Sequence, residues 1–340
     1  MPEFSIIIPA YNVADFIGET LRSVISQDFS DWEALVVNDG STDNTEKIIE
    51  QYCSVNEKIH LVSQKNGGLS AARNRGILCA AGKYFVFLDG DDRLYPGALE
   101  AYHKSVIFFN EPDIICGRGY VEFPDDRPEA EVYHAYVEIP EEIQTGHQAF
   151  SWIIRHRAVL VGSVWTRCYH RRLFQDGQLM FVPGRLHEDE EWAPRAFYRA
   201  KTVCFADTYS ILYRIRIGSI MHGDASRKIA CMVQNIQDMT AFLNGCVFER
   251  RQDAEPFIDD ILFQYASFLI RMNYSFKDKA AALKLRKRRK ISRLLSSSQY
   301  FSECSQLGCF LYFLVRNLEI LPFLLPMAHG LIRITYKFKK

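Results

Sequence analysis

The first hundred residues alternate between short apolar runs and longer segments whose apolar positions recur every three or four residues. Short apolar runs bounded by turn residues are typical of buried strands, and the longer pattern is typical of helices. We predict strands at Phe4–Ile8, Glu33–Val37, Ile59–Val62, Tyr84–Leu88 and Asp113–Cys116. We predict helices at Val13–Gln27, Thr42–Cys53, Ser70–Ala80 and Pro96–Phe109. This order indicates an α/β fold, a mostly parallel sheet with helices on both faces.

Polar turns follow each of the first four predicted strands. They are Pro9–Asn12, Asn38–Asp43, Gln64–Gly68 and Asp89–Asp92. Ligands of parallel sheets bind outside the carboxyl ends of the strands, so these turns should line one crevice. Each turn alone has a purely structural explanation, as a helix N-cap or a tight turn. Their common place at one edge favours a binding site.

The turn Asp89-Gly90-Asp91-Asp92 is the most informative feature of the chain. Asp89 and Asp91 lie two residues apart, so in an extended chain their carboxylates point the same way. Crowded carboxylates repel one another unless a cation lies between them. Mg²⁺ suits such a turn, because it takes one or two carboxylates and leaves positions open for phosphates. The alternative is an acidic turn on a solvated surface. A G-x-G-x-x-G fingerprint is absent, which argues against an ordinary NAD enzyme.

The composition of the chain indicates the cellular compartment. The chain has 340 residues, enough for two domains, and a net charge of zero, so no overall field attracts nucleic acid or membrane. Its nine cysteines include no C-x-x-C pair, which indicates a reducing compartment. The first strand begins at Phe4, which leaves no room for a signal peptide. We therefore expect the protein in the cytosol or on the cytosolic face of a membrane.

The C-terminal third has a different character. Residues Phe257–Met272 carry an apolar stripe at helical spacing, which predicts a packing surface. A basic run follows at Lys284–Arg293, and then two apolar segments at Cys304–Val315 and Ile320–Ile332. Each segment is shorter than the about 20 residues that span a bilayer. This arrangement suggests an element that lies in the membrane interface. The alternative is a helical hairpin packed on the protein, or a contact between two copies of the chain.

The motifs together resemble family 2 inverting glycosyltransferases, over about residues 1–222. The resemblance rests on Ser5–Asn12, Asn38–Thr45, Asn66–Gly76, Phe87–Asp92 and His187–Trp192. It implies a GT-A (Rossmann-like) catalytic domain, a nucleotide-diphospho-sugar donor and a divalent metal, Mn²⁺ or Mg²⁺. We expect this domain at residues 1–224 and a helical C-terminal region that associates with a membrane at residues 225–340. The resemblance does not extend to that second region.

The same resemblance implies roles for the donor-binding residues. Those expected to contact the nucleotide-sugar are Pro9, Tyr11, Asn12, Asp39, Asn66, Gly67, Gly68, Arg73, Asp89, Gly90, Arg214 and Arg216. Pro9, Tyr11 and Asn12 would hold the base and ribose, and Asp39 would hydrogen-bond the base. Arg214 and Arg216 belong to a tail segment that would fold over the donor phosphates. The alternative for that segment is a solvated edge strand.

Metal and base candidates come from the acidic motifs. Asp91 is the first choice for a metal ligand, Asp89 would contact the ribose or the metal, and His222 would complete the metal site or contact a phosphate. The acceptor needs a base that removes its hydroxyl proton, and a carboxylate within hydrogen-bond reach supplies one. The resemblance places this base at Asp189, with Glu188 as second choice. Acidic residues at a helix N-terminus also favour the helix dipole, which is the structural alternative.

We therefore expect a metal-dependent inverting glycosyltransferase of the hexosyl or N-acetylhexosaminyl type. It would use a donor such as a UDP-sugar and an acceptor hydroxyl on a cell-surface polysaccharide or lipid-linked glycan, with peripheral membrane contact. Nucleic acid is not an expected partner. A nucleotidyltransferase would need a glycine-rich basic loop after the first strand, which Pro9–Asn12 is not. The remaining alternatives are a basic membrane- or nucleic-acid-binding module and an inactive glycosyltransferase-like scaffold.

Overall fold

The computed structural model describes residues 1–122, 139–156 and 162–214, and scattered helical residues between 231 and 264. Its strands are β1 (Phe4–Ala10), β2 (Trp32–Asn38), β3 (Ile59–Ser63), β4 (Tyr84–Phe87), β5 (Arg93–Leu94), β6 (Ile114–Glu122), β7 (Arg167–His170) and β8 (Val203–Arg214). Its helices are α1 (Ala14–Ile25), α2 (Thr45–Val55), α3 (Leu69–Cys79), α4 (Ala98–Phe108), α5 (Gly146–Arg155) and α6 (Glu188–Arg199), with a 3₁₀ turn at Arg171–Phe174. All the elements predicted up to residue 116 are confirmed, with bounds shifted by a few residues.

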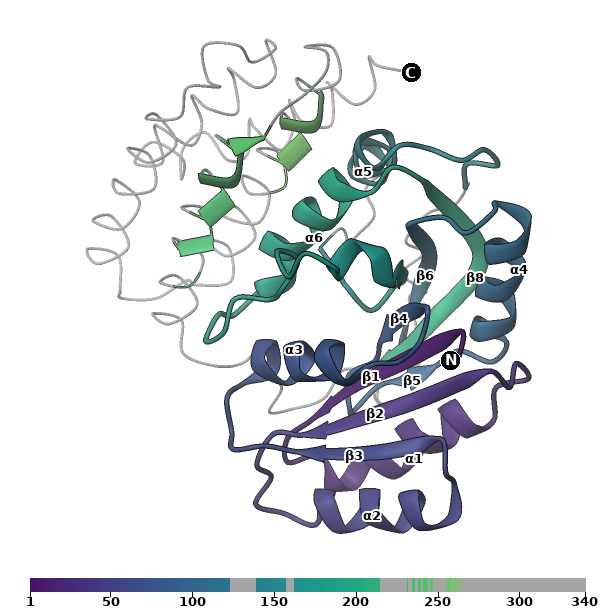
Figure 1. Cartoon of the computed structure of the whole chain (residues 1–340), viewed down its shortest axis with the longest axis vertical. Helices are drawn as coiled ribbons and strands as arrows, with labels where there is room; N and C mark the ends of the chain where they lie inside the picture. The colour runs from purple at the N-terminus through teal and green to yellow at the C-terminus, as the bar shows by residue number, and fades with distance from the viewer. Residues whose placement is uncertain are drawn as a thin grey trace. The chain divides into compact units, whose positions relative to one another are not determined.

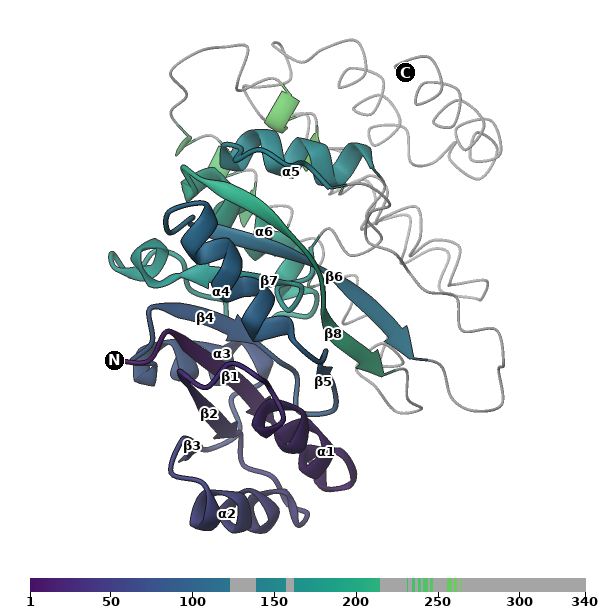
Figure 2. The ribbon, with the colours of Figure 1, turned by 90° about the vertical axis from the view of Figure 1, so that its right-hand side faces the viewer.

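The eight strands form one sheet in the order β3-β2-β1-β4-β7-β6-β8-β5. The first four strands in this order are parallel, as the strand–helix–strand pattern predicts. The other half is mixed, because β7 runs antiparallel to both β4 and β6. The long strands β6 and β8 run parallel side by side (Figure 2), and the short β5 is antiparallel to β8. The predicted α/β class is confirmed, and the parallel arrangement covers the half that carries the four polar turns.

Helices cover both faces of the parallel half of the sheet. Helices α1 and α2 lie on one face of β1–β3, and α3 lies on the other (Figure 1). The steps from β1 to β2 and from β2 to β3 move the same way, so right-handed crossovers place α1 and α2 together. The step from β3 to β4 passes back over β1 and puts α3 on the opposite face. A Cβ atom on Gly76 of α3 would lie 2.3 Å from Ile7 Cγ2, so glycine lets α3 approach β1 closely.

An aromatic cluster fixes the position of α6. Trp192 is fully buried, and its ring stacks on Phe181 with centroids 4.7 Å apart and planes 7° apart. Its ring also meets Tyr169 edge-on at 5.0 Å and Phe87 at 6.1 Å. Aromatic pairs in such geometries add to the large apolar area that each ring buries. Because Phe87 is the last residue of β4, this packing brings α6 towards the strand that precedes the acidic turn.

The chain forms two compact units, residues 1–149 with 157–223, and residues 150–156 with 224–340. The domain boundary expected near residue 224 stays a prediction. In the second unit, Phe257, Ile258 and Ile261 are helical and buried where the structure describes them. The basic run and the two apolar segments predicted to contact a membrane lie outside the described residues. No helix in the described part of the chain has the length and apolar character needed to cross a bilayer.

Candidate active site

The loops that follow β1 and β2 are joined by hydrogen bonds. Asn12 Oδ1 accepts a hydrogen bond from the backbone N–H of Thr42 at 2.8 Å, and the Asn12 N–H donates to Ser41 Oγ at 3.1 Å. Asn12 has a φ of 51°, in the left-handed region that asparagine tolerates better than most residues. These contacts hold the first two polar turns together at the edge of the sheet.

Asp39, expected to bind the base, holds the loop that follows β3. Its side chain is buried, with 2% of its surface exposed. Asp39 Oδ1 accepts hydrogen bonds from Gln64 Nε2 at 2.7 Å and from the Gly67 N–H at 2.8 Å, and Oδ2 accepts one from the Gly68 N–H at 2.7 Å. A carboxylate accepts about four hydrogen bonds, so these three leave capacity for a ligand. The base-binding role of Asp39 stays a prediction.

Two glycines bring the remaining turns into contact. Gly40 has a φ of 71°, and a Cβ atom there would lie 2.8 Å from the backbone nitrogen of Asn66. A Cβ atom on Gly90 would lie 2.9 Å from the carbonyl oxygen of Pro9. Glycine therefore allows the second turn to meet the third and the acidic turn to meet the first. Tyr11 projects at this junction with 49% of its surface exposed, an aromatic face accessible to a ligand.

The acidic turn is anchored through its last carboxylate. Asp92 is buried, and its Oδ1 accepts a hydrogen bond from the backbone N–H of Arg214 at 2.9 Å. Its other oxygen, Oδ2, has no hydrogen-bond partner among the described residues. Burial first, and then the negative charges of Asp89 and Asp91, raise the pKa of Asp92 well above its usual range. The turn therefore concentrates negative charge that a cation would relieve.

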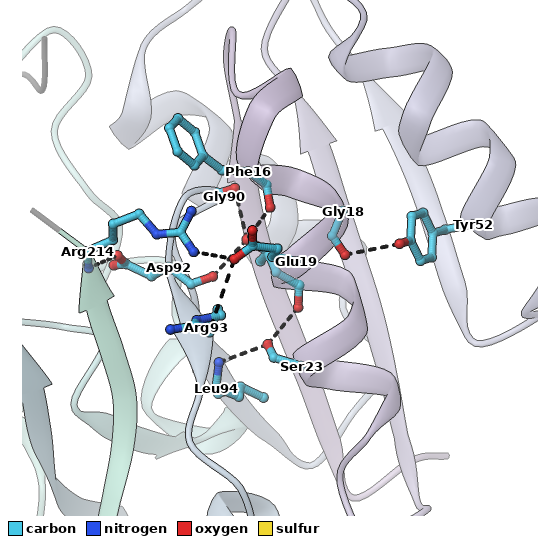
Figure 3. A network of polar contacts seen from close by, with 11 residues as sticks. Phe16, Gly18, Glu19, Ser23, Tyr52, Gly90, Asp92, Arg93, Leu94 and Arg214 are labelled. Carbon is cyan, nitrogen blue, oxygen red and sulfur yellow. Dashed lines mark hydrogen bonds and ion pairs between the residues drawn. The ribbon is translucent and has the colours of Figure 1, made fainter. Parts of the chain in front are cut away.

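Helix α1 braces both this turn and the end of β8 (Figure 3). The Thr20 hydroxyl lies 2.7 Å from the carbonyl oxygen of Asp92, to which it donates. The preceding residue, Glu19, forms an ion pair with the guanidinium of Arg214, and this contact lowers the pKa of Glu19. The Arg214 guanidinium also lies over the ring of Phe16, 5.0 Å from its centroid. Arg214, expected to face donor phosphates, is thus engaged by α1. Arg216 lies outside the described residues.

Of the predicted metal ligands, Asp89 and Asp91 are among the described residues and His222 is not. Within the described ranges, no three His, Cys, Asp or Glu side chains converge as a metal site, and His222 lies outside them. A cation bridged to a substrate diphosphate needs only one or two protein carboxylates. The unpartnered Asp92 Oδ2 and the mutual repulsion of Asp89, Asp91 and Asp92 fit a cation at this turn. The metal ligands stay a prediction.

The two base candidates stand in different environments at the start of α6. Glu188 lies one turn before the buried Trp192, so it faces inward, where Glu188 Oε1 pairs with Arg73 Nη1 at 2.5 Å. Asp189 is turned about a quarter of the way round the helix and is half-buried. Burial first, and then the charges of Glu188 and Glu190, raise the pKa of Asp189 well above its usual range, against the opposing effect of Arg73.

Arg73 connects the acidic turn to the base candidates. Its Nη2 lies 2.8 Å from Asp89 Oδ1, while its Nη1 pairs with Glu188. Burial lowers the pKa of Arg73, but the carboxylates of Asp89 and Glu188 outweigh it and raise the pKa overall. The guanidinium is therefore a permanent cation that the two motifs share.

Some residues at this edge carried no signal that singled them out in the sequence. Glu19 and Thr20 lie within an ordinary amphipathic helix, and their partners come from distant segments. Tyr213 was visible only as the start of the tail segment. Its ring stacks on Trp165, with centroids 5.3 Å and planes 2° apart. Burial first, and then the negative charges of Asp92, Asp89 and Asp91, raise the pKa of Tyr213 to about 12.

Comparison with known proteins identifies the family. The chain is 34% identical over 223 residues to the uncharacterized glycosyltransferase EpsJ of Bacillus subtilis, covering 63% of this chain and 61% of EpsJ. It is 42% identical over 100 residues to the putative teichuronic acid biosynthesis glycosyltransferase TuaG of B. subtilis, covering 29% of this chain and 40% of TuaG. The matches thus span less than two thirds of either relative.

Among solved structures, the fold is similar to that of S. aureus TarS 1-349 in complex with UDP-GlcNAc, with a TM-score of 0.67. That match is 19% identical and covers 92% of this chain and 90% of the other. The model of the family described as "Glycosyl transferase family 2" matches residues 5–177, which are more than half of the 340 residues. The expected GT-A fold is confirmed, and the chain belongs to glycosyl transferase family 2.

Proposed function

We propose that this protein is a metal-dependent inverting glycosyltransferase that moves a hexose or N-acetylhexosamine from a UDP-sugar to an acceptor hydroxyl. The observation that carries this proposal is the pairing of the buried Arg73 with Asp89 of the acidic turn and with Glu188, which brings the first turn of α6, and with it the half-buried Asp189, towards the acidic turn. A carboxylate within hydrogen-bond reach of the acceptor hydroxyl can take its proton. The UDP-GlcNAc complex of TarS supports the choice of a UDP-sugar as donor.

The donor would lie along the four loops. Tyr11 offers its exposed face to the base, and Gly67 and Gly68 let the diphosphate approach the backbone at the start of α3, where a helix N-terminus favours anions. Asp91 and Asp89 would hold the metal, joined by His222. When bound, such a metal would neutralise charge on the departing diphosphate as a Lewis acid.

Asp189 would act on the acceptor. It takes the proton of the acceptor hydroxyl while the acceptor oxygen forms a bond to the anomeric carbon and the bond from that carbon to the diphosphate oxygen breaks. UDP leaves with the bonding electrons, and the configuration at the anomeric carbon inverts. Glu188 is the weaker candidate, because its carboxylate is bound to the buried cation of Arg73.

The acceptor is proposed to be a glycan or lipid-linked glycan, handled at the cytosolic face of a membrane. The similarity to TuaG, described as a putative teichuronic acid biosynthesis glycosyltransferase, supports a polysaccharide acceptor. The basic run Lys284–Arg293 and the apolar segments after it support peripheral attachment to anionic lipids.

The test uses the full chain with UDP-glucose, UDP-galactose, UDP-N-acetylglucosamine and UDP-N-acetylgalactosamine, with water as acceptor, in Mn²⁺ or in EDTA. We expect UDP release from at least one of them, and only with the metal. Asp189→Asn should keep UDP affinity and lose about 10²–10⁴-fold in rate, the usual contribution of a general base. Asp91→Asn should lose the metal-dependent part of UDP binding. A rate in Asp189→Asn equal to wild type, or release unaffected by EDTA, contradicts the proposal.

A further inference from the structure

The guanidinium of Arg73 is enclosed by protein. Only 2% of the side chain is exposed, and its two terminal nitrogens pair with Asp89 at 2.8 Å and with Glu188 at 2.5 Å. The ring of Phe181 covers it, with Arg73 Cζ 5.4 Å from the ring centroid. The resemblance led us to expect Arg73 beside the nucleotide and diphosphate, but the structure gives both ends of its fork to protein carboxylates.

A move of Arg73 towards a phosphate would be costly. Glu188 has 8% of its side chain exposed, and removing its cation would leave a buried carboxylate uncompensated. Such a loss is strongly destabilising, whereas an arginine that binds substrate must be able to exchange protein partners for the ligand. The surroundings of Arg73 are therefore those of a structural link within the site.

The two carboxylates that Arg73 joins have different tasks in the proposed reaction. Asp89 belongs to the donor side, follows β4 and keeps 24% of its side chain exposed. Glu188 precedes the base candidate Asp189 in the first turn of α6, and 115 residues separate it from Arg73 in the chain. A planar guanidinium fixes two carboxylates at a set separation and angle, which a flexible ammonium group does not.

We propose that Arg73 is a positioning residue, which sets the donor-side carboxylate Asp89 against the base-bearing turn of α6 and does not bind the donor diphosphate. This inference rests on the proposed function. One buried cation would then set the separation between the donor and the base. Because Glu188 is held by Arg73, Asp189 is the carboxylate available to the acceptor.

The first experiment compares Arg73→Lys with wild type in the full chain with Mn²⁺. Lysine keeps the charge and removes the fork. We measure affinities for UDP by calorimetry and for uridine by ligand-observed NMR, and the rate of UDP release from the UDP-sugar that wild type hydrolyses fastest. We expect the ratio of the UDP and uridine affinities to stay the same, and the rate to fall about 100-fold, as misplacement by about 1 Å can cause. Arg75→Lys, an exposed position on the same helix, is the matched control and should keep both values.

Two results would overturn the inference. Arg73 binds the diphosphate if Arg73→Lys lowers the affinity for UDP about tenfold or more and leaves the affinity for uridine unchanged. A loss of that size is the effect of losing one charge-assisted hydrogen bond. If the rate stays at the wild-type value, the link has no role in positioning. Failure of wild type to bind UDP would instead reject the proposed donor.

A second measurement uses no ligand and does not depend on whether an Arg73 variant folds. We measure the unfolding free energies of Asp89→Asn, Glu188→Gln and the double variant. Because both carboxylates share one guanidinium, we expect the two effects to be non-additive. Strict additivity would show that Arg73 does not couple the two carboxylates, and the inference would fail whatever the donor is.

Discussion

The carboxylate of Asp39 offers the sharpest test of how the donor edge is built. In the structure this buried group accepts three hydrogen bonds, from Gln64 Nε2 and from the N–H groups of Gly67 and Gly68. Asp39→Asn keeps the shape but replaces one oxygen with an NH₂ group. The less costly orientation keeps the two bonds at Oδ1 and turns the NH₂ group towards the Gly68 N–H, 2.7 Å from Oδ2.

The magnitude follows from that geometry. A hydrogen bond to a charged group contributes about 1.5–3 kcal/mol, and the variant loses one such bond and gains a donor–donor contact. We expect Asp39→Asn to lower the unfolding free energy by about 2–3 kcal/mol. For a unit of this size that corresponds to a fall in Tm of about 5–10 °C. Because the bonds hold the Gly67 and Gly68 loop, UDP affinity should fall as well.

The assay is thermal unfolding of the ligand-free protein, followed by a UDP titration in Mn²⁺. Asp28→Asn, at an exposed aspartate, removes the same charge and should leave Tm within about 1 °C, as surface substitutions usually do. If ligand-free Asp39→Asn unfolds at the wild-type temperature, the three hydrogen bonds do not hold the loop. Asp39 would then contribute to the ligand alone, and our reasoning about the edge would be wrong.

Three further predictions concern the base, the core and β8. The pKa of Asp189 is raised in the folded state, so the ionised carboxylate destabilises the fold. In urea titrations, the unfolding free energy of Asp189→Asn should therefore equal that of wild type near pH 4 and exceed it at pH 8. Gly76→Ala should cost about 1–3 kcal/mol in the same assay, because its Cβ would lie 2.3 Å from Ile7 Cγ2. Glu19→Gln should tighten UDP binding in calorimetry, since Arg214 then loses a competing carboxylate.

Each of these has its own contrary result, and the core substitution also has a matched control. Gly18→Ala places a Cβ no closer than 3.5 Å to its neighbours in α1, so it should be neutral or stabilising, and equal costs at Gly18 and Gly76 would refute the packing argument. A pH-independent stability difference for the base variant would mean that Asp189 titrates normally. Unchanged UDP affinity in Glu19→Gln would assign Arg214 to anchoring β8.

The sequence predicted the parallel half of the fold and the edge that carries the site. Alternation of short apolar runs and helical segments is a local property, set by backbone geometry and side-chain period, and it located β1 to β4 and the helices between them. Parallel strands bring their carboxyl ends together, so the polar turns had to meet once the strands paired. The acidic turn Asp89–Asp92 follows one of these strands, whereas the acids before Trp192 were identified through the family resemblance.

The partners of those residues were decided by the tertiary structure. Arg73 joins Asp89 to Glu188 because stacking of Trp192 on Phe181 sets the rotation of α6, and no local pattern connects side chains 115 residues apart. In the same way Arg214 meets Glu19 only through the packing of β8 near α1. Local periodicity determines which faces of a helix or strand are apolar. Ion pairs between distant segments depend instead on how whole helices and strands pack, and a local sequence pattern does not predict that packing.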